Sequence, residues 1–533
     1  MSYSISPGAY WEQVDLSVRV ASFATSQGAI VIESDTGPAF QRILCTSVDD
    51  FVAKFGQPNP KYPSMYCAVA FLEVSNSLNV VRVTKDAIHG GVTFVKVPDP
   101  NDPQAPASSL LSGWVVGEPD PENTLVMSDD MVFAIYDKSP GDHDIRVSIE
   151  REEYGDGGFH VLVFNGLSTN PVERYQVSLE QRTNGNGDQM YAPQVINSRS
   201  NRIGFIVNKQ FDGIISDDLI DQDMPKVRMQ AGTNGSRVTS AEVMRGFELF
   251  RNAELVDANI LINGGWSRSE VQLKMDDIAK SRKDCMAVLD MPSAYQELQA
   301  AIDYRTGLGS GDGLGLDSSF SAIYSPDVLI YDMFTATDMY IPPSGHVAAC
   351  YAYTDKTTNV YRSPAGTTRG RLNVKGVRHV YDQGARDAIW KMQINPIRVI
   401  PKRGIYVWGD TTLQTKSSAL QYVNVQRTLS HLGKSIAYTL IDFVFDPNDN
   451  ILRQTLVSIS NQVLETAKSD GGVIDYKAVC DASNNKPHTI DAGYLYLDVY
   501  IKPTLSARVI HLRAAVTSQG ASFDVAQQQL NRS

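Results

Sequence analysis

The sequence predicts an α/β and α+β multidomain protein. At 533 residues the chain exceeds the length of about 250–300 residues at which a single hydrophobic core stops growing. Segments with helical spacing alternate with short apolar runs over much of the chain, whereas residues 91–205 show almost only the two-residue period of strands. The hydrophobic fraction of 42% and the charged fraction of 20% are typical of a folded globular protein.

Residues 9–20 have the alternation of a half-buried strand. One face of this candidate arm carries apolar side chains and a single acid, namely Tyr10, Glu12, Val14, Leu16 and Val18. The turn residues Ser-Pro-Gly precede it. The alternation alone leaves open whether this strand pairs within its own domain or with another chain.

Residues 21–90 read as a compact α/β segment. The runs GAIVIES and LNVVRVTK predict strands, and SVDDFVAKFG predicts a helix with a serine cap. The four prolines of VPDPNDPQAP then mark a boundary, because proline prevents regular pairing. An inserted β-rich domain is expected over 91–205, where MVFAIYDKSPG, HDIRVSIE, FHVLVFNG and ERYQVSLE are short alternating runs.

Helix and strand patterns alternate again over 206–405. SAEVMRGFELFRNAE and SEVQLKMDDIAKSRKD have helical spacing, whereas VDANILINGG and CMAVLDMP read as buried strands. Right-handed crossovers between such strands give a mostly parallel sheet covered by helices. Residues 406–493 follow with the strand GIYVWG and two long helices, the first of which has the apolar stripe Tyr422, Val425, Leu429, Leu432, Ile436 and Leu440.

A second candidate arm begins at residue 494. The alternation of YLYLDVYIKP places four aliphatic side chains on one face, namely Leu495, Leu497, Val499 and Ile501. Pro503 then prevents the strand from continuing at the centre of a sheet, because proline has no amide hydrogen to donate. On the residues alone, both arms are expected to close sheets of their own domains, since segments near chain ends more often pair locally or fray.

Charge and composition exclude several classes of function. The net charge of −12 argues against binding to nucleic acid, which needs a basic face. No apolar run is long enough for membrane insertion, and residues 1–9 lack the features of a signal peptide, so we expect synthesis in a cytoplasm. The five scattered cysteines read as buried thiols, and no His or Cys pair has zinc-ligand spacing.

Two motifs resemble ligand-binding loops but lack required residues. The segment GLGSGDGLGLD at 307–317 contains no G-x-G-x-x-G register and no Gly-Lys-Ser/Thr ending, so a flexible surface loop is favoured. FDPNDNILR at 445–453 begins like a calcium loop, but Ile451 stands at its glycine position and Val457 at its glutamate position. A turn and helix N-cap explain it better.

His346 is the strongest candidate for catalysis. Ser344 precedes it by two residues and Asp355 follows by nine, yet the members of a catalytic triad normally converge from separate elements. The chain has no G-x-S-x-G elbow. We therefore expect a structural histidine, with a serine hydrolase as the alternative.

Arg427, His431 and Lys434 share one face of the first long C-terminal helix. A solvated helix surface is the ordinary explanation. On an acidic protein, the same face is also suited to an acidic partner.

Six phrases, in order along the chain, resemble the tail sheath proteins of contractile bacteriophages and related injection machines. They are SPGAYWEQVDLS, IYDKSPGDHDIRVSI, SPDVLIYDMFTATDMYIPPSGHVAACYAYTD, SPAGTTRGRL, INPIRVIPKRGIYVWGDTTL and VFDPNDNILRQ. The stretch from Tyr340 to Arg453 is the most specific part of this resemblance. The sequence departs from the family pattern at Ala349 and Cys350, where glycine is common.

The resemblance implies a structural protein without catalytic residues, metal or cofactor. Its middle region is expected to have a subtilisin-like α/β fold that lacks protease activity. The family assembles as six-fold rings stacked helically around a tail tube, in a metastable extended state that contracts to drive the tube through the host envelope for genome ejection. The implied partners are further copies of the chain, the tail tube protein, and baseplate and tail terminator proteins. The implied location is the virion tail, assembled in the host cytoplasm, and a bacterial injection machine is the alternative setting.

The same resemblance favours exchange of both arms between subunits, with 9–20 and 494–502 adding strands to a shared sheet. It also assigns contact with the tube to Arg427, His431 and Lys434, because a few salt-screened charge pairs allow release. An inner domain is expected to combine the two end segments of the chain. The expected divisions are a 1–20 arm, a 21–90 part of the α/β core, a 91–205 β-rich outer domain, a 206–405 subtilisin-like domain, a 406–493 inner domain and a 494–533 strand and arm.

Overall fold

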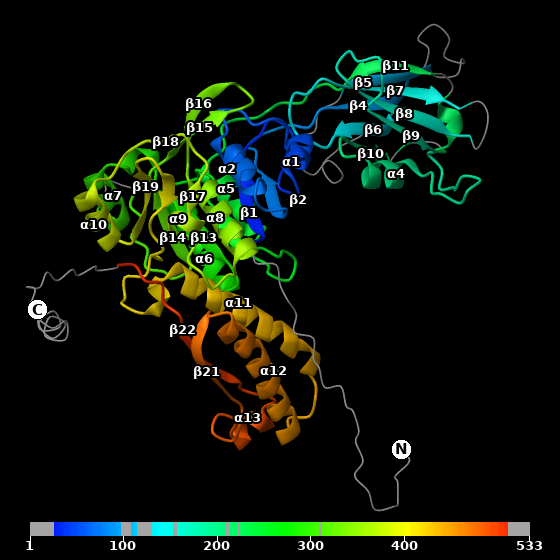
Figure 1. Cartoon of the computed structure of the whole chain (residues 1–533). Coiled ribbons are helices and arrows are strands. Elements are labelled where there is room, and N and C mark those ends of the chain that lie inside the picture. Colours follow the sequence, from blue (N-terminus) through cyan, green and yellow to red (C-terminus); the bar gives the residue numbers. More distant parts are fainter. Residues whose placement is uncertain are drawn as a thin grey trace, which may run out of the picture.

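The computed structural model describes residues 26–97, 108–113, 131–152, 157–208, 211, 214–220, 223–308 and 312–509. Figure 1 shows three parts: a large α/β unit, a β-rich unit to its upper right, and a C-terminal unit, in orange and red, below it. The fold is therefore mixed α/β and multidomain with several sheets, as the sequence predicts.

A nine-stranded sheet runs through the large unit in the order β17-β20-β19-β14-β13-β12-β1-β3-β2. Pairing is parallel from β3 to β19 and antiparallel at both ends of the sheet. The strands are β1 (Gly28–Ile32), β2 (Arg42–Cys45), β3 (Leu78–Arg82), β12 (Ile260–Ile262), β13 (Met286–Asp290), β14 (Ser321–Ser325), β17 (Arg371–Leu372), β19 (Ile394–Ile400) and β20 (Gly404–Val407).

Helices cover both faces of this sheet. Ile30 and Ile32 of β1 pack in the hydrophobic core with α1, α2 and α8, whereas Ala29 and Val31 point to the core on the other face. A strand buried on both faces needs this unbroken apolar run. The helices are α1 (Val48–Phe55), α2 (Pro63–Leu72) and α8 (Ser344–Thr357) on one face, and α5 (Ser240–Glu248), α6 (Ser269–Arg282), α7 (Leu298–Thr306) and α10 (Gln383–Lys391) on the other.

Strands β1 and β3 lie in the middle of the large sheet. Strand β1 pairs with β12 on one side and with β3 on the other. Both strands are fully buried, as strands of a sheet covered on both faces must be. The described residues 26–90 are thus part of the large unit.

Two four-stranded antiparallel sheets form the β-rich unit, with strand orders β10-β6-β4-β5 and β11-β7-β8-β9. Stacked rings of Phe94, Phe133 and Phe205 contribute to the core of this unit. The unit extends beyond residue 205, where the sequence analysis ended it. Its elements are β4 (Gly91–Val97), β5 (Ser108–Gly113), β6 (Met131–Asp137), β7 (Ile145–Arg151), β8 (Phe159–Asn165), β9 (Glu173–Val177), α4 (Ala192–Arg199), β10 (Ile203–Val207), η1 (Asp217–Leu219) and β11 (Met224–Arg228).

The chain enters and leaves the β-rich unit along two neighbouring antiparallel segments. Isolated bridges pair Lys85 with Ser236, Ile88 with Thr233, and Gly91 with Gln230. Ile88 and Thr233 exchange both backbone hydrogen bonds at 3.0 Å. The two connections therefore form one ladder.

The C-terminal unit contains α11 (Val423–Leu440), α12 (Asn450–Ser469), β21 (Val473–Val479), α13 (Pro487–Asp491) and β22 (Asp498–Pro503). Its predicted apolar stripe is confirmed, since Val425, Leu432 and Ile436 are buried. The predicted turn and cap are confirmed too, because Asp449 accepts a hydrogen bond from the Leu452 amide at 2.7 Å. The remaining elements are η2 (Ser293–Tyr295), β15 (Val328–Asp332), β16 (Thr337–Ile341), α9 (Gly366–Arg369), β18 (Gly376–Val377), η3 (Ala419–Gln421) and η4 (Ile441–Phe443).

Candidate assembly site

The C-terminal unit ends in a two-stranded antiparallel sheet of β21 and β22. Its register pairs Tyr476 with Ile501 and Ala478 with Val499. Val499 and Ile501 pack against the core formed with α11 and α12, as does Leu497 just before the strand. The predicted aliphatic face thus covers the chain's own helices.

Strand β22 begins later than the predicted start at residue 494. The Asn485 side chain donates to the Tyr496 carbonyl at 2.9 Å and accepts from the Tyr496 amide at 2.7 Å. The backbone groups of Tyr496 are thereby satisfied by a side chain in place of a strand ladder. Leu495, on this stretch, is half-buried.

Each strand of this sheet has one neighbour among the described residues, so each also has an open edge. An open edge presents backbone groups to which a further strand can pair. The arm predicted over 9–20, with Tyr10, Glu12, Val14, Leu16 and Val18, lies outside the described residues.

Arg508 fixes the segment that follows β22 to the large unit. Its guanidinium donates to Asp410 Oδ1 at 2.8 Å and to the Gln421 carbonyl at 3.3 Å. It also stacks over the Tyr422 ring, 3.5 Å from the ring centroid, and lies 5.4 Å from the centroid of Trp390. These contacts fix the position of the described segment that follows β22. No local pattern in the sequence indicates this role of Arg508, because its partners are distant in sequence.

The predicted basic face on α11 is not a free surface, and this expectation is wrong. Arg427 is 5% exposed and makes two hydrogen bonds to the Asp355 carboxylate of α8, at 3.0 and 2.5 Å. Its guanidinium also lies over the Tyr351 ring. Helical periodicity identified a shared face but could not show that it packs against acids of the large unit.

The other two members of that face also contact the large unit. Lys434 bridges Asp257 at 2.5 Å and Asp284 at 3.3 Å. His431 lies in a small pocket with Cys285 and Arg427. Burial, followed by the charges of Arg427 and Lys434, lowers the pKa of His431 to about 4, so this side chain is neutral at pH 7. These residues hold α11 against the large unit.

His346, Ser344 and Asp355 do not form a triad. Ser344 Oγ donates to Asp290 Oδ2 at 2.7 Å, and Asp355 binds Arg427. Burial raises the pKa of Asp290 to about 7 and lowers that of His346 to about 4. The Nδ1 atom of His346 is buried and makes no hydrogen bond to a described residue. A serine that is fully buried and bonded to a carboxylate is not presented to a substrate.

The other candidate chemical sites are also structural where the structure describes them. All five cysteines are buried and free, as the sequence predicts. The described residues contain no cluster of His, Cys, Asp and Glu able to hold a metal ion. Gly307 ends α7 in the left-handed conformation, and Asp312 of the glycine-rich segment accepts from the Ser269 hydroxyl at 2.8 Å. No described helix has the length and hydropathy needed to cross a bilayer.

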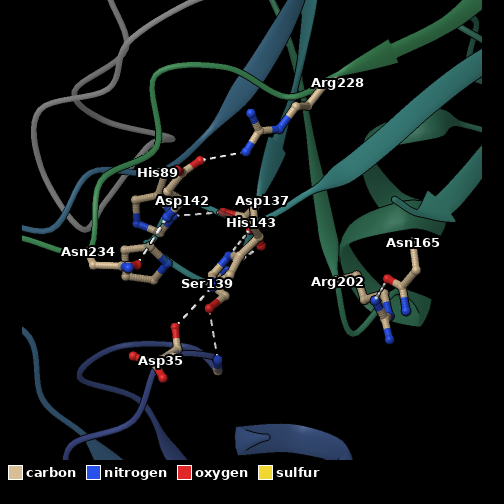
Figure 2. A network of polar contacts seen from close by, with 12 residues as sticks. Asp35, His89, Asp137, Ser139, Asp142, His143, Asn165, Arg202, Arg228 and Asn234 are labelled. Carbon is tan, nitrogen blue, oxygen red and sulfur yellow. Dashed lines mark hydrogen bonds and ion pairs between the residues drawn. The ribbon is translucent and has the colours of Figure 1, made fainter. Parts of the chain in front are cut away.

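A polar network joins the β-rich unit to the large unit, and Figure 2 shows the part of it around Asp35, Asp137, Ser139 and His143. Arg82 of β3, which Figure 2 does not label, also belongs to this network and is 2% exposed. Its guanidinium donates to carbonyls of the loop after β1 (Ser34, Asp35 and Gly37) and, across the junction, to the Pro140 carbonyl and the Ser139 hydroxyl. Burial lowers the pKa of Arg82 to about 10, which leaves it charged at pH 7.

His143 provides a second link across this junction (Figure 2). Its Nδ1 lies 2.6 Å from Asp137 Oδ2, and its Nε2 lies 2.9 Å from the Asp35 carbonyl oxygen. Because both partners are acceptors, both ring nitrogens donate, which requires the imidazolium form. Burial alone would lower the pKa of His143, but the hydrogen bond and charge of Asp137 outweigh it and hold this pKa above its ordinary value.

The junction is expected to stabilise the protein most at acidic pH. A raised pKa in the folded state gives a stabilisation that is complete below about pH 6.5 and is lost as pH rises through the folded-state value. His143→Asn should remove this component of the pH dependence of thermal unfolding. His488→Asn, at an exposed histidine, is the matched control and should leave the pH profile unchanged. Equal profiles for His143→Asn and the parent chain would contradict the assignment.

A basic segment of the large unit was missed by the sequence analysis. Residues 362–403 contain ten Lys or Arg and two Asp. Their formal charge is therefore +8, whereas the net charge of the whole chain is −12. A running count of charge along the sequence would have found it. The ten cations are Arg362, Arg369, Arg371, Lys375, Arg378, Arg386, Lys391, Arg398, Lys402 and Arg403.

The C-terminal unit matches a known protein family. Residues 415–517 match the model of the phage tail sheath C-terminal domain. The tail sheath protein of Enterobacteria phage T4 is 27% identical over 308 residues, which cover 55% of this chain and 47% of that protein. The chain thus spans about half the length of this curated relative.

Two solved structures share the fold. The sheath tail protein of Desulfitobacterium hafniense superposes with a TM-score of 0.53 at 12% identity, covering 93% of this chain and 96% of that one. The helical sheath of the anti-feeding prophage in its contracted state gives a TM-score of 0.51 at 15% identity, covering 96% and 99%. The resemblance to tail sheath proteins that the sequence predicts is confirmed.

Proposed function

We propose that this protein is the structural subunit of a contractile sheath. In this role it polymerises as stacked six-fold rings around a tail tube, in a metastable extended state, and contracts to drive the tube through a host envelope for genome ejection. The tube, baseplate and terminator proteins are its proposed partners, and the virion tail is its proposed location. A bacterial injection machine would use the same subunit.

The observation that carries the proposal is the open two-stranded sheet of β21 and β22. Similarity to the T4 tail sheath protein and to a contracted helical sheath supports the same role. A shared sheet holds neighbouring copies through backbone hydrogen bonds while the linkers outside it bend. Large movements of rigid subunits are then possible without loss of contact.

The proposed occupant of the open edge is the 9–20 arm of another copy. Its alternation gives one apolar face, as an added strand requires. A variant lacking residues 1–20 should form no long tubes in negative-stain electron microscopy, under conditions in which the full chain forms them. Tubes of normal length from the truncated chain would overturn the arm exchange.

Two substitutions on opposite faces of the arm provide a matched comparison. Val14→Asn with Leu16→Asn removes two side chains from the apolar face of the arm and should prevent assembly. Gln13→Asn with Ser17→Asn changes the polar face by the same number of positions and should leave assembly unchanged. Equal effects of the two pairs would argue against a strand with one buried face.

The middle α/β region is proposed to be subtilisin-like in fold and to have no enzymatic role. The buried Ser344–Asp290 pair supports this, since the serine is not available as a nucleophile. The energy of contraction would then come from better interfaces in the contracted lattice. Labelling of the purified protein by a fluorophosphonate probe would contradict the absence of an activated serine.

A further inference from the structure

Four cations form an exposed or half-exposed surface at one end of the nine-stranded sheet, which we name the basic stripe: Arg386, Arg398, Lys402 and Arg403. The last three belong to the β19–β20 hairpin, and Arg386 lies on α10 beside it. Burial, followed by the charge of nearby Arg398, lowers the pKa of Arg386, and the charges of Asp387 and Asp382 only partly oppose this. Arg386 and Arg398 are therefore close enough to repel each other.

Within the part of the chain that the structure describes, no acidic side chain lies within ion-pair distance of the basic stripe. By contrast, Lys375 and Arg378 of the same segment pair with Asp338 and Asp327. Apolar side chains accompany the stripe. Val399 and Trp408 are each 36% exposed, and Arg398 lies over the Trp408 ring.

The turn between α11 and α12 has the opposite charge. Residues 441–450 contain three Asp and no Lys or Arg, and Asp449 is already used as the cap of α12. Ile441, Val444 and Phe445 of this turn are exposed, and the Phe445 side chain is in full contact with solvent. We name residues 441–446, with Asp442 and Asp446, the apolar tip. Clustered exposed apolar side chains of this kind mark contact with another protein.

The basic stripe and the apolar tip cannot meet within one chain. Lys434 of α11 contacts Asp257 and Asp284, which precede β12 and β13, so α11 lies at the end of the sheet where the parallel strands begin. Strand β19 is parallel to β14 and reaches its turn at the opposite end. Figure 1 shows the same separation, with α11 and α12 below the large unit.

We infer that the apolar tip of one copy binds the basic stripe of a second copy. Outside residues 362–403 the chain carries a formal charge of −20, so another copy is itself an acidic partner for the stripe. Opposite charge and exposed apolar groups on both surfaces provide the complementarity. Two different surfaces in contact give a head-to-tail interface, which continues into rings or helices. The inference rests on the proposed polymerisation and names one of its contacts.

Charge exchange tests this contact. Lys402→Glu with Arg403→Glu reverses the two charges at the hairpin turn of the stripe, and Asp442→Lys with Asp446→Lys reverses the tip. Each double variant alone should need at least about tenfold more protein to assemble, since like charges then face each other. An equal mixture of the two should recover assembly, because reversed tips can then meet reversed stripes and normal tips can meet normal stripes, so that opposite charges face each other at both contacts. Arg174→Glu with Arg199→Glu on the β-rich unit is the matched control and should assemble normally.

Association of the soluble chains by analytical ultracentrifugation separates this contact from the proposed function. Normal assembly of either double variant, failure of the mixture to recover, or an equal loss in the control would each overturn the contact. If the parent chain forms no tubes but the mixed variants still associate more tightly than either alone, the contact stands and the sheath role fails. A stripe that instead binds the tail tube predicts no recovery in the mixture.

Discussion

Replacing Arg427 with methionine should lower the free energy of unfolding by about 3–5 kcal/mol. The substitution leaves the Asp355 carboxylate, whose side chain is 3% exposed, without the guanidinium that binds it through two hydrogen bonds. Desolvation of a carboxylate is costly once its cation is removed. Denaturant unfolding followed by circular dichroism measures the change, and limited proteolysis reports whether the C-terminal unit has separated.

A double-mutant cycle identifies the cause of this loss. Asp355→Asn combined with Arg427→Met should recover part of the stability, because no buried charge then remains at the pair. Arg228→Met is the matched control, since its partner Asp142 is 62% exposed, and should cost less than about 1 kcal/mol. A loss at Arg427 no larger than that at Arg228 would contradict the proposed role of the buried pair.

Replacing Arg82 with methionine should cost at least about 3 kcal/mol, since each buried carbonyl left without a donor costs about 1–3 kcal/mol. The Arg82 side chain donates to four backbone carbonyls of two segments that meet at the junction with the β-rich unit. Thermal unfolding measures the loss. Hydrogen exchange should increase first in the loop after β1 and in the segment after β6.

Arg82→Lys distinguishes the geometry of the guanidinium from its charge. A single ammonium cannot reach the carbonyls that the planar fork spans, so lysine should recover little of the stability. Full recovery by lysine would mean that charge alone holds the junction. The Pro140 carbonyl and the Ser139 hydroxyl would then be incidental contacts.

The sequence predicted those elements that local pattern determines. The run GAIVIES became the buried strand β1, and SVDDFVAKFG became α1 with Ser47 as its cap. The position of β1 in the sheet was not predicted, because its partner β12 lies more than 200 residues further along the chain. Periodicity identifies buried faces but contains no information on which distant segment covers them.

The same limit explains the errors at the candidate site. Arg427, His431 and Lys434 do share a face, yet nothing near them in sequence shows that acids of α8 and of the segments before β12 and β13 lie opposite. The shorter extent of β22 results from Asn485, whose side chain replaces a strand partner. The family resemblance, by contrast, depended on phrases preserved in order along the chain.

The ladder between the two connections of the β-rich unit has a consequence for how such proteins diversify. Since Gly91 and Gln230 are bonded neighbours, the chain enters and leaves the β-rich unit at one place, which the contacts of Arg82 and His143 support. A different module can be inserted at this place while β3 before it and α5 after it keep their positions in the large unit. The β-rich unit can then be exchanged while the nine-stranded sheet keeps its strands and their order.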